Sequence, residues 1–172
     1  MVKFVAHPDG RFDFGQRTLR CALGRSGVTP AAEKREGDGA SPVGVWAIRK
    51  VLYRPDQTAD GRAPQTALPC EPIARDDGWC DDPEHEAYNR PIKLPFTGSF
   101  EKMWRDDHLY DLVVVLAHND DPPRPYHGSC IFMHLAKEGY SPTEGCVALA
   151  REDLEAVLAA ARPGDAVEIA AD

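Results

Sequence analysis

The sequence predicts a single, mainly β domain with peripheral helices. Short runs of β-branched and aromatic residues recur along the chain, whereas one long segment alone has the spacing of an amphipathic helix. No internal repeat, low-complexity tract or linker divides the sequence. The 172 residues, of which 42% are hydrophobic, fit one domain over residues 1–172, since folded chains of this size bury roughly 70% of the surface that they expose when unfolded.

The N-terminal part is predicted to be a β-meander. Its strands are expected in VKFVAH (2–7), RFDF (11–14) and RTLRCAL (17–23). The PDG sequence after the first of them predicts a turn, because Pro fixes φ and Gly supplies the left-handed conformation. Residues 24–44 carry so many Gly, Pro and charged residues that we expect mostly loop, followed by a strand in VWAIRKVLYR (45–54).

The middle of the chain has a weaker pattern. Residues 55–95 are rich in Pro and Asp and poor in aliphatic residues, which predicts a long functional loop. A short helix is expected in SFEKMWRDDHLYDL (99–112). The continuous β-branched run LVVVLAH (112–118) predicts a buried strand, and SCIFMHL (129–135) predicts another. Alternation in the second places Cys130, Phe132 and His134 on one face.

The C-terminal part holds the clear helix, REDLEAVLAAARPGD (151–165). The apolar residues Leu154, Val157, Leu158 and Ala161 lie at i, i+3, i+4 and i+7, acids occupy the first turn, and Pro163-Gly164 follows the last apolar residue. AVEIA (166–170) is expected to close the fold as a strand.

Composition excludes some classes of function. The formal net charge of -8, with acids spread along the chain, argues against nucleic-acid binding, which needs concentrated Lys and Arg. The sequence contains neither an apolar run typical of a signal peptide nor one of a membrane span, so we expect a cytoplasmic location, with the periplasm as the alternative. Its five cysteines have no regular spacing, which favours reduced thiols over a disulfide framework or structural zinc.

Cys146 in PTEGCVAL is a candidate nucleophile. Gly145 before it permits a sharp turn and the close approach of a substrate. His134 lies twelve residues upstream, at the end of a predicted strand, where a returning chain brings its imidazole beside the thiol as a base. A thiol paired with a base is expected to have a depressed pKa. The alternative is a buried structural cysteine, and the spacing alone does not decide between the two.

The segment SCIFMHLAKEGYSPTEGCVAL resembles the catalytic signature of the YkuD-type L,D-transpeptidases. In that signature, a strand ending in His is followed by a short loop and then by Ser or Thr, a variable residue, Gly, Cys and an apolar residue. The resemblance extends through CALGRSG, KREGDGASPVGVWAI, DGWCDDPEHEAYNRPI and WRDDHLYDLVVVLAHN. It implies a β-sandwich or barrel-like domain. It also implies an enzyme without cofactor whose Cys attacks the carbonyl of the third residue of a peptidoglycan stem peptide and releases the following D-residue.

Carried onto this sequence, the resemblance assigns Cys146 as nucleophile and His134 as base. Gly145, with the backbone N–H of Cys146, is assigned to the oxyanion hole, and Thr143 takes the Ser/Thr position. The chain departs from the family pattern at Glu144, where His or Arg is usual, and two residues after Cys146, where it has Ala. Both departures concern recognition of the substrate.

Further substrate-binding candidates lie in the WCDDP…YNR loop, which recurs in the resembling sequences: Trp79, Tyr88, Asn89 and Arg90. Arg90 suits a carboxylate because its fork donates two hydrogen bonds, or it pins the loop through Asp81 or Asp82. Asn119 is placed either to bind a peptide backbone or to cap a strand.

Three other features have simpler interpretations. His127 is expected to be a polar loop residue, and Cys130, where the resembling sequences commonly carry Ala, a buried spacer. The cluster of metal-capable side chains is expected to be a solvated acidic loop, so no metal is predicted; it consists of Asp81, Asp82, Glu84, His85 and Glu86.

Three functions remain open at this point. The first is thiolate acyl transfer on muropeptides, and the second is a catalytically silent module that binds peptidoglycan peptides. The third is a metal-dependent hydrolase, which lacks a convincing ligand set. Within the first, a cytoplasmic enzyme meets soluble muropeptides in ~55 M water, without the effective molarity that favours an amine acceptor. We therefore expect an L,D-carboxypeptidase of muropeptide recycling, with transpeptidation, by 3-3 cross-linking or D-amino-acid exchange, as the alternative.

Overall fold

The computed structural model describes residues 3–172, and its N-terminal strands form the expected meander. These strands are β1 (Lys3–Ala6), β2 (Arg11–Phe14) and β3 (Arg17–Ala22), paired antiparallel in the order of the chain. The turn between β1 and β2 contains Gly10 at φ +87°, a left-handed conformation that Gly adopts without strain. The turn prediction for PDG is therefore confirmed.

A ten-stranded sheet contains most of the remaining strands. They are β4 (Val28–Pro30), β5 (Ser41–Tyr53), β6 (Cys70–Pro72), β10 (Leu112–Leu116), β11 (Phe132–Leu135), β12 (Val147–Leu149) and β13 (Ala166–Ile169). The strand order is β10-β11-β12-β3-β2-β1-β13-β5-β4, with β6 beside β5. Because β10 also pairs with β5, the sheet closes on itself, which confirms the predicted barrel-like, mainly β fold.

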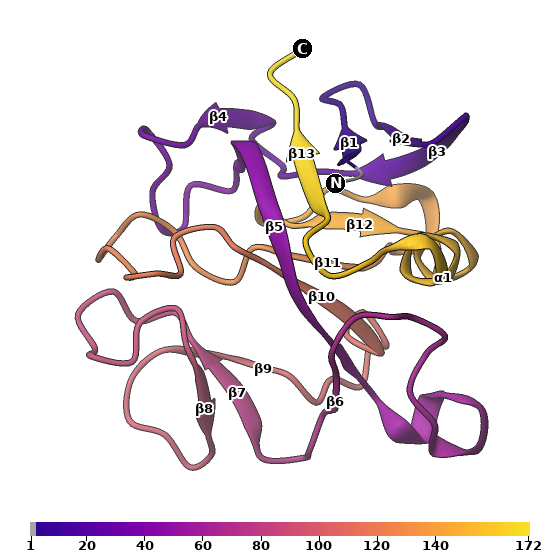
Figure 1. The fold of residues 1–172 in the computed structure, drawn as a ribbon. Helices are drawn as coiled ribbons and strands as arrows, with labels where there is room; N and C mark the ends of the chain where they lie inside the picture. The colour runs from indigo at the N-terminus through magenta and orange to yellow at the C-terminus, as the bar shows by residue number, and fades with distance from the viewer. Residues whose placement is uncertain (1–2) are drawn as a thin grey trace.

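The long strand β5 links the two halves of the molecule, as Figure 1 shows. Its N-terminal part pairs with β13 and its C-terminal part with β10. The strand begins at Ser41, inside the stretch that the sequence indicated as loop. Pairing on both sides explains this difference, since ladder hydrogen bonds from β13 and β4 hold residues whose own propensity for strand is low.

A second sheet forms where the sequence indicated a loop and a helix. It has three strands in the order β8-β7-β9: β7 (Asp77–Cys80), β8 (Pro91–Lys93) and β9 (Phe100–Lys102). The helix expected over 99–112 is absent from the described structure, so that prediction is wrong. Residues 100–102 instead pair with β7, with Glu101 opposite Trp79, so tertiary pairing overrides a weak helical pattern.

Helical structure is otherwise limited in the described residues. The α-helix is α1 (Arg151–Ala160), as predicted, and Leu154, Val157 and Leu158 on its apolar face are fully buried. The short 3-10 turns are η1 (Pro55–Gln57), η2 (Ala59–Gly61) and η3 (Glu138–Tyr140). No helix in the described part of the chain is long and apolar enough to cross a membrane.

The strands β10 and β11 form a wall between two apolar clusters. On one side, Val114 and Met133 join the interior of the barrel together with α1. On the other side, Val113 and Phe132 pack toward the small sheet. The alternation predicted for 129–135 is confirmed, because Cys130 and Phe132 share the second side.

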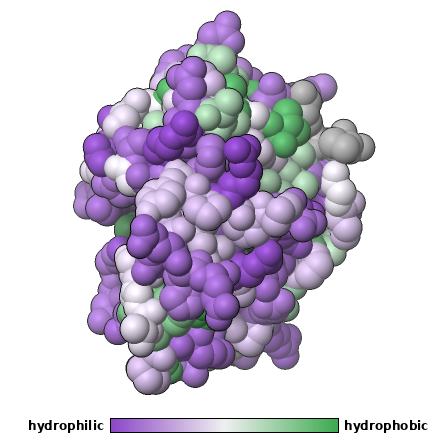
Figure 2. Space-filling model, turned by 90° about the vertical axis from the view of Figure 1, so that its left-hand side faces the viewer, coloured by the Kyte–Doolittle hydropathy of each residue, from purple (hydrophilic) through white to green (hydrophobic). Residues whose placement is uncertain are grey.

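The outer surface is mostly polar, as the face in Figure 2 illustrates. Among the described residues, the large apolar side chains that stand exposed are Val45 and Tyr126. Tyr126 is anchored there, since its hydroxyl donates a hydrogen bond to Glu84 at 2.6 Å.

Candidate active site

Cys146 and His134 lie on neighbouring strands with their side chains on the same face. The strands β11 and β12 are parallel, with Met133 beside Val147 and His134 beside Ala148. Cys146 immediately precedes β12, so it and Ala148 point to the same side as His134. Both Cys146 and His134 line one cavity of about 160 Å³. The fold thus brings together the pair that the sequence suggested.

A tight turn presents the thiol. Gly145 has φ +138°, and a Cβ there would stand 2.9 Å from the carbonyl oxygen of Ala40, so only glycine fits. The Thr143 hydroxyl accepts from the N–H of Gly145 at 3.1 Å and donates to the carbonyl of Cys146 at 2.7 Å. Ser41 supports the turn from β5, since its hydroxyl donates to the Gly145 carbonyl at 2.8 Å.

The same turn leaves one backbone donor available. The Gly145 N–H is engaged by Thr143, whereas the N–H of Cys146 makes no hydrogen bond with any residue that the structure describes. In this resting arrangement the N–H of Cys146 is the donor that this turn offers to a developing oxyanion.

The tautomer of His134 suits a general base. Its Nδ1 lies 2.9 Å from the carbonyl oxygen of Leu135 and must donate there, because a carbonyl only accepts. In the neutral ring Nε2 then carries a lone pair. Tyr110 packs edge-on against the ring, with centroids 5.3 Å apart. The imidazole is thereby fixed in one orientation.

Burial keeps the resting pair uncharged. Loss of water raises the pKa of the Cys146 thiol to about 12, with a further contribution from the charge of Glu101. Burial lowers the pKa of His134 to about 4. The expectation of a depressed thiol pKa is therefore wrong for the resting structure. The thiol instead donates to the carbonyl of Cys130 at 3.0 Å, and the proton must move when substrate binds.

Two cavities meet at Cys146 and differ in their charged groups. The first, shared with His134, is also lined by Arg105 and Lys137. The second, of about 210 Å³, is lined by Glu36 and Asp81 and by the buried Lys34. Glu101, Glu144 and Cys146 border both. Burial raises the pKa of Glu101, opposed by the hydrogen bond that it accepts from Tyr110.

Most of these lining residues were not among the candidates from sequence. Glu36, Glu101, Arg105, Tyr110 and Lys137 come from segments read as loop or helix, and no local pattern marks them. Glu144 is at the site as expected, where its carboxylate forms an ion pair with Arg25 at 2.9 Å.

The two aromatic candidates, Trp79 and Tyr88, are buried next to the site and hydrogen-bond to other residues of the protein. Trp79 is buried, donates from Nε1 to Asn89 at 3.0 Å and packs edge-on against Phe132. Tyr88 is also buried, donates to Glu36 and accepts from the N–H of Gly128 at 3.0 Å. Neither lines the two cavities at Cys146. Tyr88 therefore holds Glu36 in place, whereas Trp79 holds Asn89.

Arg90 and Asn119 lie outside both cavities. Arg90 is exposed, and among the described residues its side chain pairs with neither Asp81 nor Asp82. Asn119 holds a turn, since its Nδ2 donates to the carbonyls of Arg124 and Gly128 and its Oδ1 accepts from the N–H of Arg124. A capping role accounts for these contacts.

Two further candidates from sequence, His127 and Cys130, do not line the cavity that Cys146 shares with His134. His127 is partly exposed and borders neither cavity at Cys146, while Cys130 lines the second cavity and is 6% exposed. Within residues 3–172, no three His, Cys, Asp or Glu side chains form a group that could hold a metal ion. This includes the acidic loop after β7.

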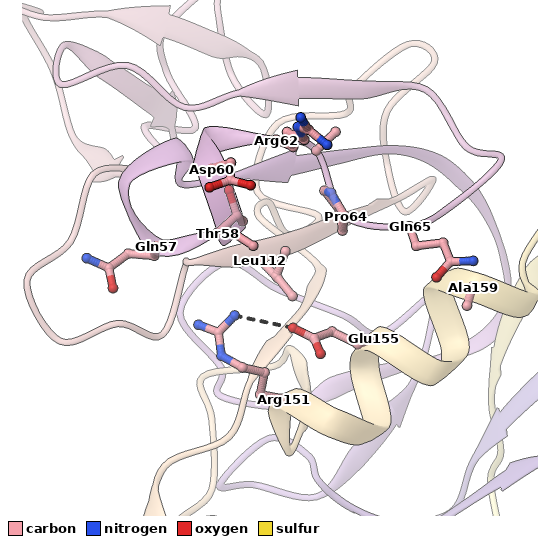
Figure 3. A pocket seen from close by; sticks show the side chains of 12 residues that line it. Gln57, Thr58, Asp60, Arg62, Pro64, Gln65, Leu112, Arg151, Glu155 and Ala159 are labelled. Carbon is pink, nitrogen blue, oxygen red and sulfur yellow. Dashed lines mark ion pairs between the residues drawn. The ribbon is translucent and has the colours of Figure 1, made fainter.

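A larger cavity, of about 690 Å³, lies elsewhere, between η1–η2 and α1 (Figure 3). Arg151 and Glu155 on α1 face Asp60 and Arg62 across it. Arg151 is already paired with Glu155 at 3.5 Å and with Asp111 at 3.0 Å. No cysteine or histidine lines this cavity, so it lacks the thiol–imidazole pair found at Cys146.

Comparison with known proteins agrees with the resemblance. The family model for the L,D-transpeptidase catalytic domain, YkuD, matches residues 7–169. No curated protein matches the chain significantly.

Solved structures similar to the chain include two from Mycobacterium tuberculosis. L,D-transpeptidase 1 is 14% identical, with a TM-score of 0.43 over 98% of this chain and 58% of that one. L,D-transpeptidase 3, solved with a faropenem-derived adduct, is 15% identical, with a TM-score of 0.47 over 98% of this chain and 60% of that one. An L,D-transpeptidase from Mycobacterium smegmatis is 13% identical, with a TM-score of 0.43 over 99% and 58%.

The chain thus spans about 58–60% of the length of these structures. The family model, in contrast, covers nearly all of the chain, including the turn of Gly145 and both members of the thiol–imidazole pair. The chain therefore belongs to the L,D-transpeptidase catalytic domain family.

Proposed function

We propose that this protein is a cysteine acyl-transfer enzyme that acts on the stem tetrapeptides of peptidoglycan as an L,D-carboxypeptidase. The observation that carries the proposal is the thiol of Cys146 and the imidazole of His134 on one face of parallel strands, at one cavity. Retention of both groups favours catalysis over a silent peptide-binding module.

The steps follow from the resting protonation states. As Cys146 Sγ attacks the carbonyl carbon of residue 3, its proton passes to Nε2 of His134, and the N–H of Cys146 donates to the oxyanion. The tetrahedral intermediate then breaks its C–N bond, and His134 protonates the leaving amine of the D-residue. Water next attacks the thioester and gives a proton to His134. The sulfur leaves and recovers that proton, so the thiol is restored.

Arg105 and Lys137 support a substrate that ends in a free carboxylate. Both line the cavity of His134. The guanidinium of Arg105 forms an ion pair with Asp107, whereas the ammonium of Lys137 forms no ion pair with the described residues. A D-residue leaving toward His134 places its terminal carboxylate beside these cations. In this proposal, they take the role that the sequence suggested for Arg90.

Water as the main acceptor is favoured by the size of the site. Cys146 is 8% exposed, and the cavities beside it have volumes of about 160 and 210 Å³. Spaces of this size admit water readily. The five free cysteines suit a reducing compartment, and we propose recycling of soluble muropeptides in the cytoplasm. Cell fractionation checks this location.

The test is incubation with a purified tetrapeptide muropeptide, with and without an amine acceptor, followed by mass analysis. We expect tripeptide and a free D-amino acid as the main products in both reactions. Cross-linked or exchanged peptides as the main products would instead establish a transpeptidase. Binding without any product, in protein with a labelled and accessible Cys146, would establish the silent module.

A further inference from the structure

Two of the free cysteines border the same small cavity. Cys130 and Cys146 both line the space of about 210 Å³ that His134 does not line, and both belong to the apolar cluster on that side of the wall. The carbonyl oxygen of Cys130 accepts the hydrogen bond of the Cys146 thiol at 3.0 Å. Neither cavity at Cys146 is lined by the other three cysteines, Cys21, Cys70 and Cys80.

The backbone of Cys130 is fixed beside the turn of Gly145. Its φ is +56°, a left-handed conformation that is uncommon for a residue with a side chain, and its N–H donates to Oδ1 of Asn89 at 3.1 Å. A disulfide requires two Cα atoms roughly 4.4–6.8 Å apart. The contact between Sγ of Cys146 and the Cys130 carbonyl holds the two residues this near to each other, so rotation about χ1 of Cys146 turns its sulfur from that carbonyl toward the Cys130 thiol.

The two thiols differ in the base that can deprotonate them. Burial raises the pKa of both, so both are neutral at rest. Cys146 has the imidazole of His134 in the cavity on its other side, whereas no histidine lines the cavity that it shares with Cys130. Cys146 is therefore the thiol that reacts first with an oxidant, and Cys130 is placed to react with the product.

We propose that Cys130 is a resolving cysteine, which forms a reversible disulfide with Cys146 after hydrogen peroxide has oxidised the nucleophile. Sγ of Cys146 gives its proton to Nε2 of His134 and attacks one peroxide oxygen. The O–O bond breaks, and the leaving hydroxide takes the proton from His134 as water. Sγ of Cys130 then attacks the sulfur of the resulting sulfenic acid, and the hydroxyl leaves with the Cys130 proton as a second water. One peroxide is reduced while two thiols become one disulfide.

This reaction protects the nucleophile and stops its chemistry for as long as the disulfide persists. A sulfenic acid without a resolving thiol is oxidised further to a sulfinic acid, which thiols do not reduce, whereas a disulfide is opened by exchange with a small dithiol. The inference goes beyond the proposed function, because the disulfide forms whether or not the protein releases a D-residue from a peptide.

The test is oxidation of the reduced protein with hydrogen peroxide, followed by alkylation of the remaining thiols and tryptic peptide mapping. Each cysteine falls in a different tryptic peptide, and Lys137 separates Cys130 from Cys146. We expect these two peptides to be joined, with the loss of two hydrogen atoms in mass, and both thiols to return after treatment with dithiothreitol. A different pairing, or oxidised Cys146 beside a free Cys130, overturns the proposal.

A variant measures the protection. At the same dose of peroxide, Cys130→Ala should accumulate at least about tenfold more Cys146 sulfinic acid than the wild-type protein, and dithiothreitol should not reverse it. Cys80→Ala removes a buried cysteine that lines neither cavity and should behave like the wild-type protein. Equal yields of sulfinic acid in the wild-type protein and in folded Cys130→Ala refute the protective role. If either variant fails to fold, the peptide map of the wild-type protein decides whether the disulfide forms.

Discussion

The two sides of the wall formed by β10 and β11 have opposite roles. Met133 points into the barrel and is fully buried with Leu149 and α1. His134, the next residue, points to the other side, where the cavity of Cys146 lies. One strand thus places one residue in the apolar interior and the next at the candidate active site. The site side tolerates buried polar groups because the barrel side supplies the apolar packing.

The largest expected effect is on the site side. Cys146→Ala should abolish release of the D-residue, whereas Cys130→Ala should retain most of it, because only Cys146 follows the turn of Gly145. Turnover measured by mass analysis, with circular dichroism as the folding control, checks the pair. Equal loss in both folded variants would remove Cys146 from its assigned role.

His134→Gln should lower kcat by about 10²–10⁴-fold, the usual cost of losing a general base. The fold should remain near native, because Gln fills much of the same space. Steady-state rates and the melting temperature separate the two effects. If activity stays close to that of the wild-type protein, another group acts as the base, and His127 is the first to test.

Met133→Ala should show the reverse pattern on the barrel side. Removal of a fully buried Met side chain costs about 2–5 kcal/mol in the free energy of unfolding. The folded fraction should keep its kcat, because the side chain points away from Cys146. Urea unfolding and active-site titration measure the two quantities. A loss of kcat without loss of stability would show that the wall does not separate the two sides.

Acid should weaken the fold through its buried histidines. Burial lowers the pKa of His134 and that of His118 to about 4, from an ordinary value of about 6.5. At these two histidines the unfolded chain therefore binds more protons below pH 6.5, so the loss of stability that they cause grows as the pH drops and is complete below about pH 4. Each histidine contributes a loss of up to about 3 kcal/mol. Urea unfolding between pH 7 and 4 measures this, and a slope unchanged in His118→Gln would contradict it.

Arg90→Ala should have the smallest effect. The side chain is exposed and lines neither cavity at Cys146. KM should therefore stay within about twofold of the wild-type value, and the free energy of unfolding should stay within about 0.5 kcal/mol of it. A parallel Lys137→Ala variant should raise KM instead. A rise in KM with Arg90→Ala would return the carboxylate contact to the position that the sequence suggested.

Sequence determined the elements whose pattern is local. The helix α1 follows from the spacing of Leu154, Val157 and Leu158, and the strands of the wall follow from continuous β-branched runs. The candidate nucleophile and base are recognisable for the same reason, since Gly145-Cys146 and His134 lie within thirteen residues of one another on a recurring motif.

Only the tertiary structure decided the small sheet and the charges around the thiol. Strand β9 forms because β7 offers it hydrogen bonds, and nothing in its own residues requires this. Glu36, Asp81, Glu101 and Arg105 come from three separate segments, and they become neighbours of Cys146 only when the sheets close. The neutral resting state of Cys146 and His134 also depends on the tertiary structure. Packing of the wall removes water from both groups and so sets both pKa values, and no single position of the sequence encodes this.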